Sequence, residues 1–160
     1  ISDSHITGEG FYVEGFYVEG EAVDFSVKVW SVASKSLVAT CRHTASVTAL
    51  AAMPDGMRFL SFAHDGEIRV WLLNGTLKNT FKLHDHVVHA LVTLPDNQHA
   101  LSGAGDRTVK LFNVNDGAVL RTFTQHTSYV FCLALMPDGR RFVCGSVERT
   151  NLVEHGLAPQ

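Results

Sequence analysis

The sequence repeats itself about every 41 residues, and this periodicity limits the possible folds more than any other feature. Three similar turns mark the period: Pro54-Asp55-Gly56, Pro95-Asp96-Asn97 and Pro137-Asp138-Gly139. A histidine precedes each turn by 11 residues, and an aspartate recurs with an aromatic residue six positions after it. These recurring residues are His43, His84 and His126, then Asp24, Asp65 and Asp106, and then Trp30, Trp71 and Phe112. Because they share one register, we interpret the chain as a tandem array of one structural unit.

Each unit is predicted to contain four short strands. Segments such as 47–52 and 68–71 are rich in strand-forming residues, and no segment has the apolar spacing of an amphipathic helix. Further tight turns are indicated at His64-Asp65-Gly66 and Leu73-Asn74-Gly75, where glycine accepts the positive φ that such turns need. Three turns in one period leave four strands, which is the composition of an antiparallel β-propeller blade. We therefore predict an all-β fold without helices.

These repeats resemble the WD40-repeat family over roughly residues 14–153. The resemblance implies repeats at about 14–42, 43–83, 84–125 and 126–154, between an irregular or extra-strand segment at 1–13 and a tail at 155–160. The pentapeptide at 11–15 is duplicated at 16–20, and the two copies could form a short extra strand pair. Counting strands gives about three and a half blades, whereas closed propellers usually have about 4–8. We expect a partial propeller of about three to four blades, a fragment of a larger ring or an unclosed ring, whose open edges would allow self-association.

In the WD40 family, a histidine, a serine or threonine, an aspartate and a tryptophan of each repeat form a buried hydrogen-bonded tetrad. The resemblance assigns these roles most completely to His43, Ser61, Asp65 and Trp71. The partial sets are His84, Ser102, Asp106 and Phe112; then Asp24 and Trp30, with Gly20 at the serine position; and then His126, with Cys144 and Glu148 at the serine and aspartate positions. A complete network satisfies its buried polar groups. We therefore expect Asp65→Ala to cost more stability than Asp106→Ala or Glu148→Ala.

Two groups of residues have the composition of reactive sites, and we interpret both as structural. His43, Ser61 and Asp65 have the residue types of a hydrolase triad, but the set recurs along the chain and no nucleophile-elbow motif surrounds the serine. The segment 84–89, with three histidines and one aspartate, is the densest metal-like cluster, although His84 already belongs to the repeat pattern. We predict no catalytic residue, no metal site and no cofactor.

Composition excludes several classes of partner. The net charge of -3 offers no basic excess to attract nucleic acid, and no apolar run approaches the roughly 18 residues of a membrane span. The three cysteines are an odd number without paired spacing, which favours free thiols over a disulfide framework. No secretory signal pattern opens the sequence, which begins with Ile rather than Met, as an excerpt would. We expect an intracellular protein, cytoplasmic or nuclear, without nucleic-acid or membrane partners.

The resemblance implies a non-enzymatic scaffold that binds peptides or domains of other proteins on one face of the propeller. The alternative is a substrate-recognition or regulatory segment of a larger enzyme complex, such as a ubiquitin ligase receptor or a multidomain signalling protein. Loops on a rigid sheet scaffold can vary without disturbing the core. The face residues that the resemblance nominates are Thr44, Ser46, His64, Asp85, Val87, Gly105, Thr127, Tyr129 and Val147. Of the nearby aromatic residues, we expect Phe123 and Phe131 to face the core and Tyr129 to be exposed.

Overall fold

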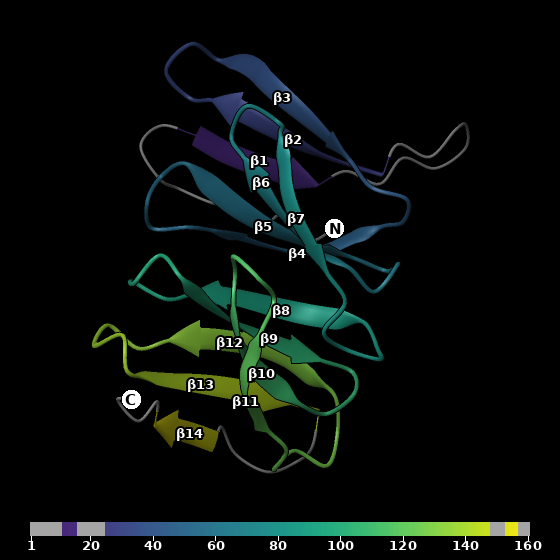
Figure 1. The fold of residues 1–160 in the computed structure, drawn as a ribbon, viewed down its shortest axis with the longest axis vertical. Coiled ribbons are helices and arrows are strands. Elements are labelled where there is room, and N and C mark those ends of the chain that lie inside the picture. The colour runs from purple at the N-terminus through teal and green to yellow at the C-terminus, as the bar shows by residue number, and fades with distance from the viewer. Residues whose placement is uncertain (1–10, 16–24, 148–152, 157–160) are drawn as a thin grey trace.

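The computed structural model describes residues 11–15, 25–147 and 153–156, and these form strands, turns and loops without any helix (Figure 1). The strands of this part of the chain make four antiparallel sheets stacked along the long axis of the molecule. The prediction of an all-β fold made of four-stranded units is confirmed, with two of the sheets complete at four strands. We call the sheets blades 1 to 4, in chain order.

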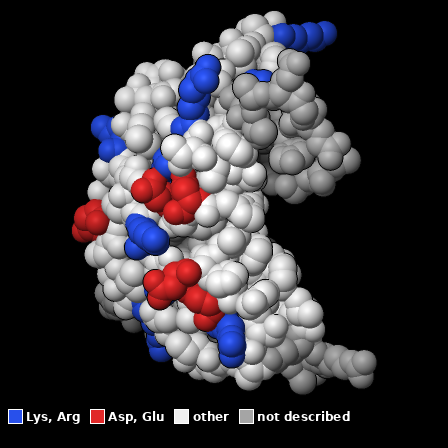
Figure 2. Space-filling model, turned by 90° about the vertical axis from the view of Figure 1, so that its right-hand side faces the viewer, with Lys and Arg blue, Asp and Glu red and all other residues white. Residues whose placement is uncertain are grey.

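The blades follow the sequence repeat, one after another. Blade 1 contains β1 (Phe11–Gly15), β2 (Ser26–Ser31) and β3 (Ser36–Arg42). Blade 2 contains β4 (Val47–Ala52), β5 (Arg58–Ala63), β6 (Ile68–Leu72) and β7 (Leu77–Phe81). Blade 3 contains β8 (Val88–Thr93), β9 (His99–Ala104), β10 (Val109–Asn113) and β11 (Val119–Phe123). Blade 4 contains β12 (Val130–Leu135), β13 (Arg141–Ser146) and β14 (Val153–Gly156). Blades 1 and 4 lie at opposite ends of the stack, so the described residues form an open crescent and close no ring (Figures 1 and 2).

Blade 1 departs from the alignment that the sequence suggests. The 41-residue period places 14–15 at the turn that opens the second strand and Gly20 inside that strand. In the structure the first copy of the duplicated pentapeptide is itself the strand β1, and Phe11 pairs with Ser31 as Arg58 of blade 2 pairs with Leu72. Because the pentapeptides at 11–15 and 16–20 are identical, the sequence alone does not indicate which of them forms the strand. The second copy, 16–20, lies outside the described residues.

The core lies between the blades, because the facing surfaces of neighbouring sheets are buried against each other. Blade 2 and blade 3 share the largest apolar cluster, which includes Leu60, Phe62, Ile68 and Phe112. A second cluster joins blade 3 to blade 4, and a third joins blade 1 to blade 2 around Val27, Val29, Cys41, Phe59 and Trp71. Each blade is thus stabilised by the next.

Polar contacts at one edge of the strands also join blades 2 and 3. Arg58, at the start of β5, donates to the backbone oxygen of Asn97 over 2.7 Å and to the side-chain oxygen of Asn115 over 3.2 Å. The turn after β10 presses against β7 so closely that a Cβ on Gly117 would lie 2.3 Å from a ring carbon of Phe81. Gly117 also has a φ of +75°, which favours glycine. These contacts fix blades 2 and 3 relative to each other at the edge where β5 begins. The edge at the other end of the strands is therefore held on a rigid support.

Candidate partner-binding face

The polar set of blade 2 is organised around the buried hydroxyl of Ser61. His43 Nε2 lies 2.8 Å from Ser61 Oγ, and Trp71 Nε1 donates to the same oxygen over 2.8 Å. Arg69 donates to His43 Nδ1 and, over 2.8 Å, to Asp65 Oδ2. Asp65 is therefore joined to the histidine through Arg69 and not by a direct bond. A guanidinium cannot accept a hydrogen bond, so His43 carries its proton on Nε2 and donates it to Ser61.

The electrostatics of this set agree with a neutral histidine and an ionised aspartate. Burial and the positive charge of Arg69 lower the pKa of His43 to about 4. Burial opposes ionisation of Asp65, but hydrogen bonds from Thr44 and Arg69 outweigh it and hold the pKa of this carboxyl below its ordinary value. The Thr44 hydroxyl donates to Asp65 Oδ2 over 2.7 Å, which also connects the set to the loop at the protein surface.

Blade 3 holds the same residue types in a different pattern. Asp106 Oδ2 lies 2.7 Å from His84 Nδ1, and His84 Nε2 lies 2.7 Å from Ser102 Oγ. Burial lowers the pKa of His84 despite the neighbouring carboxylate, so the ring is neutral, donates from Nδ1 to Asp106 and accepts from Ser102 at Nε2. Phe112 stands where Trp71 stands in blade 2, and its ring has no N–H to donate to Ser102. The second carboxylate oxygen of Asp106, Oδ1, accepts a hydrogen bond from the Thr108 hydroxyl over 2.7 Å.

The polar sets of blades 1 and 4 each include a residue outside the part of the chain that the structure describes. In blade 4 the Cys144 sulfur stands at the serine position, 2.8 Å from His126 Nε2, and burial raises the pKa of this thiol to about 11. In blade 1, Trp30 is half-buried in β2. Asp24 and Glu148, the residues assigned to the aspartate position of these two repeats, lie outside the described residues.

The aspartate, histidine and serine of blade 3 are hydrogen-bonded in the order of a hydrolase triad, but the serine has no access to a substrate. Ser102 and Ser61 are both completely buried, and the side chain of His84 has no exposed surface. A nucleophile must reach a reacting atom of its substrate. These sets can therefore fix the strands and loops around them, and they cannot attack a molecule from solvent.

The loop before each inner strand and the turn after each second strand meet at one edge of the blades, which we call the rim. Backbone hydrogen bonds join them: His64 N donates to Ser46 O and Gly105 N donates to Val87 O, both over 2.9 Å. Figure 2 faces this side of the crescent and shows acidic and basic atoms alternating along it, so charge of neither sign dominates. The rim is a rigid, mixed-charge surface.

The structure places most of the nominated face residues at the rim surface. Six are exposed: Thr44, His64, Asp85, Thr127, Tyr129 and Val147. Ser46 and Val87 are partly buried, and Val87 packs against the core shared by blades 2 and 3. Gly105 is buried, and a Cβ there would lie 2.4 Å from His86 Nδ1. The glycine thus makes room for the His86 ring, which provides the surface at that point.

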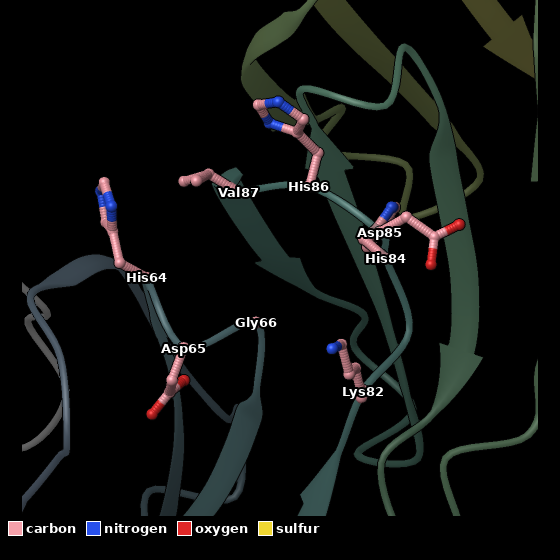
Figure 3. Close-up of a pocket in the computed structure, with 8 residues that line it drawn as sticks. All are labelled: His64, Asp65, Gly66, Lys82, His84, Asp85, His86 and Val87. Atoms are coloured by element: carbon pink, nitrogen blue, oxygen red, sulfur yellow. The ribbon is translucent and has the colours of Figure 1, made fainter.

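A hollow of about 290 Å³ separates the rim of blade 2 from that of blade 3. Figure 3 shows the rings of His64 and His86 on opposite sides of it, with Val87 between them. The Lys82 ammonium points into the hollow, and its Cε lies 3.3 Å from the position of a Cβ on Gly66. The hollow therefore has aromatic rings and an aliphatic side chain at its mouth and one cation inside.

Aromatic side chains continue from this hollow onto blade 4. The His86 ring centroid lies 5.4 Å from that of Tyr129, and His89 stacks on Phe131 at 4.7 Å. Tyr129 is 42% exposed and Phe131 is 43% exposed, and their rings lie 6.1 Å apart. Burial and the neighbouring imidazoles of His86 and His64 lower the pKa of His89, so its ring is uncharged at neutral pH. Together with His64, these four residues form what we call the aromatic rim.

Sequence reasoning missed three members of the aromatic rim. Phe131 was expected in the core, but a register shift between Val130 and Cys132 interrupts the alternation of β12 and leaves this ring exposed. His86 and His89 were considered only as metal-like residues. The signal that could have found His89 is its place in the repeat, since β8 has the same register shift between Val88 and Ala90. Phe123, in contrast, is buried as expected.

Two further searches of the described residues concern metal-binding groups and membrane-spanning helices. Within it, no group of three or more histidine, cysteine, aspartate or glutamate side chains is placed to hold a metal ion. His84, the first residue of the metal-like segment, is already bonded to Asp106 and Ser102. No helix among these residues is long and apolar enough to cross a membrane.

Comparison with protein families agrees with the blades and their polar sets. The family model described as WD domain, G-beta repeat, matches residues 35–71, 75–113 and 117–151, more than half of the chain. The chain belongs to the WD40-repeat family. Each matched WD40 segment begins near the outer strand of one blade and continues into the next blade, so one sequence repeat joins two neighbouring sheets. No curated protein matches the chain.

Membership of the WD40 family carries general expectations about activity. WD40 repeats generally serve as protein-interaction scaffolds, are usually non-catalytic and are common in intracellular proteins. Family membership therefore favours a binding role for the exposed rim and a structural role for the buried polar sets.

Proposed function

We propose that this WD40 protein is a non-enzymatic, intracellular interaction module that binds another protein through its aromatic rim. The observation that carries the proposal is a set of ring side chains distributed over three blades, with His64 across the hollow from His86 and the His86 ring 5.4 Å from that of Tyr129. Tyrosine and other aromatic residues are enriched at protein interfaces, because their large surfaces become buried with little loss of conformational freedom.

The charge of the rim supports a protein partner over a nucleic acid. Nucleic-acid binding needs a basic surface that attracts phosphate groups. Acidic and basic atoms alternate on this face, and the net charge of the chain is -3 (Figure 2). Arg69 is also paired with both Asp65 and Glu67, which leaves its charge compensated.

The rigidity of the rim supports binding without large rearrangement. Thr44 is bonded to Asp65, and backbone bonds join His64 to Ser46 and Gly105 to Val87. Side chains on a preorganised surface lose less entropy on association, which leaves more of the contact energy for affinity. No observation among the described residues favours the alternative role in an enzyme complex.

The experiment compares affinity capture from cell extract by the tagged protein and by Tyr129→Ala and His64→Ala, with quantification of every captured protein. We expect proteins bound through the rim to fall at least about tenfold with each substitution, which is the effect of losing an interface hot spot. Both side chains are exposed, so we expect melting temperatures close to that of the unsubstituted protein.

The matched control is Met57→Ala. Met57 is 68% exposed and lies in the turn before β5, at the end of that strand opposite His64. The proposal predicts that its capture profile equals that of the unsubstituted protein. A capture profile that Tyr129→Ala and His64→Ala leave unchanged would contradict the proposal, as would an equal loss with Met57→Ala.

A further inference from the structure

The outer strands of blades 1, 2 and 3 each expose an apolar side chain at the same position of the repeat. These residues are Leu37 in β3, Leu77 in β7 and Val119 in β11, with exposed fractions of 46%, 46% and 43%. Each of them pairs with the aromatic residue of its blade, at a point where all three sheets have a register shift. The three blades therefore present a repeated apolar position to solvent at one edge of their sheets.

Further large apolar side chains are exposed beside these positions. Val38 and Leu120 come directly after two of them, and Val32 lies in the turn before β3. Six of the ten large hydrophobic side chains that are exposed among the described residues thus belong to the outer strands or their turns, whereas only two belong to the aromatic rim. Exposed apolar side chains that gather in this way, instead of being scattered singly, mark an interaction surface.

The turns between the strands join the three outer strands into one surface. The turn after β6 lies against β3, because a Cβ on Gly75 would be 3.1 Å from the Cβ of Ala39. The turn after β10 lies against β7, where Asn79 Nδ2 donates to the backbone oxygen of Asn115 over 2.8 Å. In Figure 1, β3, β7 and β11 follow one another along the long axis of the molecule. We call residues 32–42, 73–81 and 114–123 the outer surface.

The outer surface is basic, although the chain as a whole is acidic. Its four basic side chains are Lys35, Arg42, Lys78 and Arg121, and its one acidic side chain is Asp116, so four positive charges minus one negative charge give +3, where the whole chain has -3. All four basic side chains are exposed. The ion pairs among the described residues use other basic side chains, so no described carboxylate compensates these four charges at ion-pair distance.

The position of the outer surface limits which kind of molecule can cover it. The inner strands β4, β8 and β12 pack against one another, so the outer strands lie on the convex side of the crescent (Figure 2). An elongated segment can follow this curve over three blades, whereas a flat bilayer meets only part of it. The phosphate groups of a nucleic acid would match the charge but would leave the aliphatic side chains uncovered.

We propose that the outer surface is a second binding site, distinct from the aromatic rim, for an acidic amphipathic segment of another protein. The apolar side chains of this segment cover Leu37, Leu77 and Val119, and its carboxylates lie beside Lys78 and Arg121. Charge complementarity selects an acidic segment over a basic one. Burial of the exposed aliphatic side chains supplies affinity that charge alone does not.

The test measures binding of three fluorescent peptides to the full chain by fluorescence anisotropy. Each is a helical peptide of about 20 residues, which spans about 30 Å. The first has leucine on one face and glutamate on the other, the second has serine in place of leucine, and the third has lysine in place of glutamate. We expect only the first to bind with a dissociation constant below about 100 μM. Absence of binding by the first peptide, or equal binding by either of the others, would overturn the proposal.

Two double variants locate the binding site of the first peptide. Leu77→Ser with Val119→Ser removes two apolar contacts, and Lys78→Glu with Arg121→Glu reverses two charges. We expect each pair to weaken binding at least about tenfold. All four side chains are exposed, so we expect melting temperatures close to that of the unsubstituted protein. Unchanged affinity in either double variant would contradict the proposed site.

Two controls change side chains outside the outer surface. Arg140→Glu reverses an exposed charge in the turn before β13, and Tyr129→Ala removes an exposed ring from the aromatic rim. Both variants are expected to bind the first peptide as the unsubstituted protein does. Loss of binding with Tyr129→Ala would place the peptide on the aromatic rim and overturn this proposal without affecting the one for the rim.

Other occupants are tested with vesicles of anionic phospholipid, with duplex DNA and with the chain alone. We expect vesicles and DNA to bind more weakly than the first peptide. Tighter binding of either one, lost with Lys78→Glu and Arg121→Glu, would assign the outer surface to a lipid or a nucleic acid and overturn the proposal. A dimer in light scattering that Leu77→Ser with Val119→Ser abolishes would mean that a second copy covers the surface, which also overturns it.

Discussion

Blades 2 and 3 hold the same polar residue types in opposite hydrogen-bond directions. In blade 2, Arg69 donates to His43, and the histidine and a tryptophan both donate to the serine hydroxyl. In blade 3, the histidine donates to Asp106 and accepts from the serine. The residue at the arginine position is Lys110, which donates instead to the backbone oxygen of Leu83. The two blades thus differ at the residue beside the histidine, and the buried histidine carries its proton on a different nitrogen in each blade.

The comparison teaches that the residues of the repeat specify a buried network without specifying its direction. Either direction satisfies the histidine and the serine, since a hydroxyl can donate or accept. The cost of removing one member then depends on how many partners it leaves unpaired, and not on whether the set matches the family pattern.

The largest difference between the blades is expected at the serine. Ser61→Ala leaves two buried donors, His43 Nε2 and Trp71 Nε1, without an acceptor, and we expect it to lower the free energy of unfolding by about 2–3 kcal/mol. Ser102→Ala removes one donor from His84 and is expected to cost about 1 kcal/mol. Urea unfolding of both variants measures the difference, and equal losses would mean that the two networks do not differ as described.

The next effect reverses the order that the sequence suggests for the aspartates. Asp106→Ala removes the carboxylate from the completely buried His84 side chain, and we expect a loss of about 2 kcal/mol. Asp65→Ala leaves Arg69 bonded to Glu67 over 2.6 Å and to His43, and we expect about 1 kcal/mol. Urea unfolding decides between the two orders: a larger loss for Asp65→Ala would support the ranking from the family pattern.

The third effect is the dependence of stability on pH. The pKa of His43 is about 4 in the folded protein, below its ordinary value near 6.5 in an unfolded chain. The unfolded chain therefore binds the proton first, so this contribution to stability is complete above about pH 6.5 and is lost as the pH falls toward 4. One such proton gives a slope of at most about 1.4 kcal/mol per pH unit.

Substitution of each histidine separates the two blades in this pH range. We expect His43→Gln to flatten the slope of unfolding free energy between pH 6.5 and 4 more than His84→Gln, because Asp106 opposes the lowering of the His84 pKa. Urea unfolding at a series of pH values measures both slopes. A larger flattening of the slope with His84→Gln would contradict this prediction, because it would mean that the pKa of His84 is lowered more than that of His43.

The smallest effect is expected when blade 2 is given the aromatic residue of blade 3. Trp71→Phe removes one donor from Ser61, while His43 remains bonded to it, and the new ring can still pack near Phe59. We expect a loss of about 1 kcal/mol in urea unfolding. In a double-mutant cycle with Ser61→Ala, the two losses should not add, because both remove the same hydrogen bond. Additive losses would show that this bond contributes nothing.

Much of the fold follows from the sequence, because period and turn chemistry are local signals. The turns at Pro54 and Pro137 fix the length of each unit, and the resemblance to the WD40 family implies that His43, Ser61 and Trp71 meet, as they do in the structure. The role of Arg69 could not be predicted, since it depends on a side chain reaching across the sheet. The start of blade 1 could not be predicted either, because the duplication provides two equal candidates for one strand.

The candidate site was predictable only where it follows the repeat. His64 and Tyr129 are exposed as the resemblance to the family suggests. His64 directly precedes the turn residue Asp65, and Tyr129 lies in the loop before the inner strand β12. Phe131 was not predicted, because a register shift in β12 breaks the alternation on which assignment to the core relied. Gly105 is buried, because its missing side chain is the space that His86 occupies.

The most direct test of the central claim is nitrogen NMR of the side chains of His43 and His84 at neutral pH. The account predicts two neutral imidazoles in opposite forms, with the proton on Nε2 in His43 and on Nδ1 in His84, both slow to exchange with water. The same tautomer in both rings, or a charged and rapidly exchanging imidazole in either, would contradict the assignment of these sets as buried structural links.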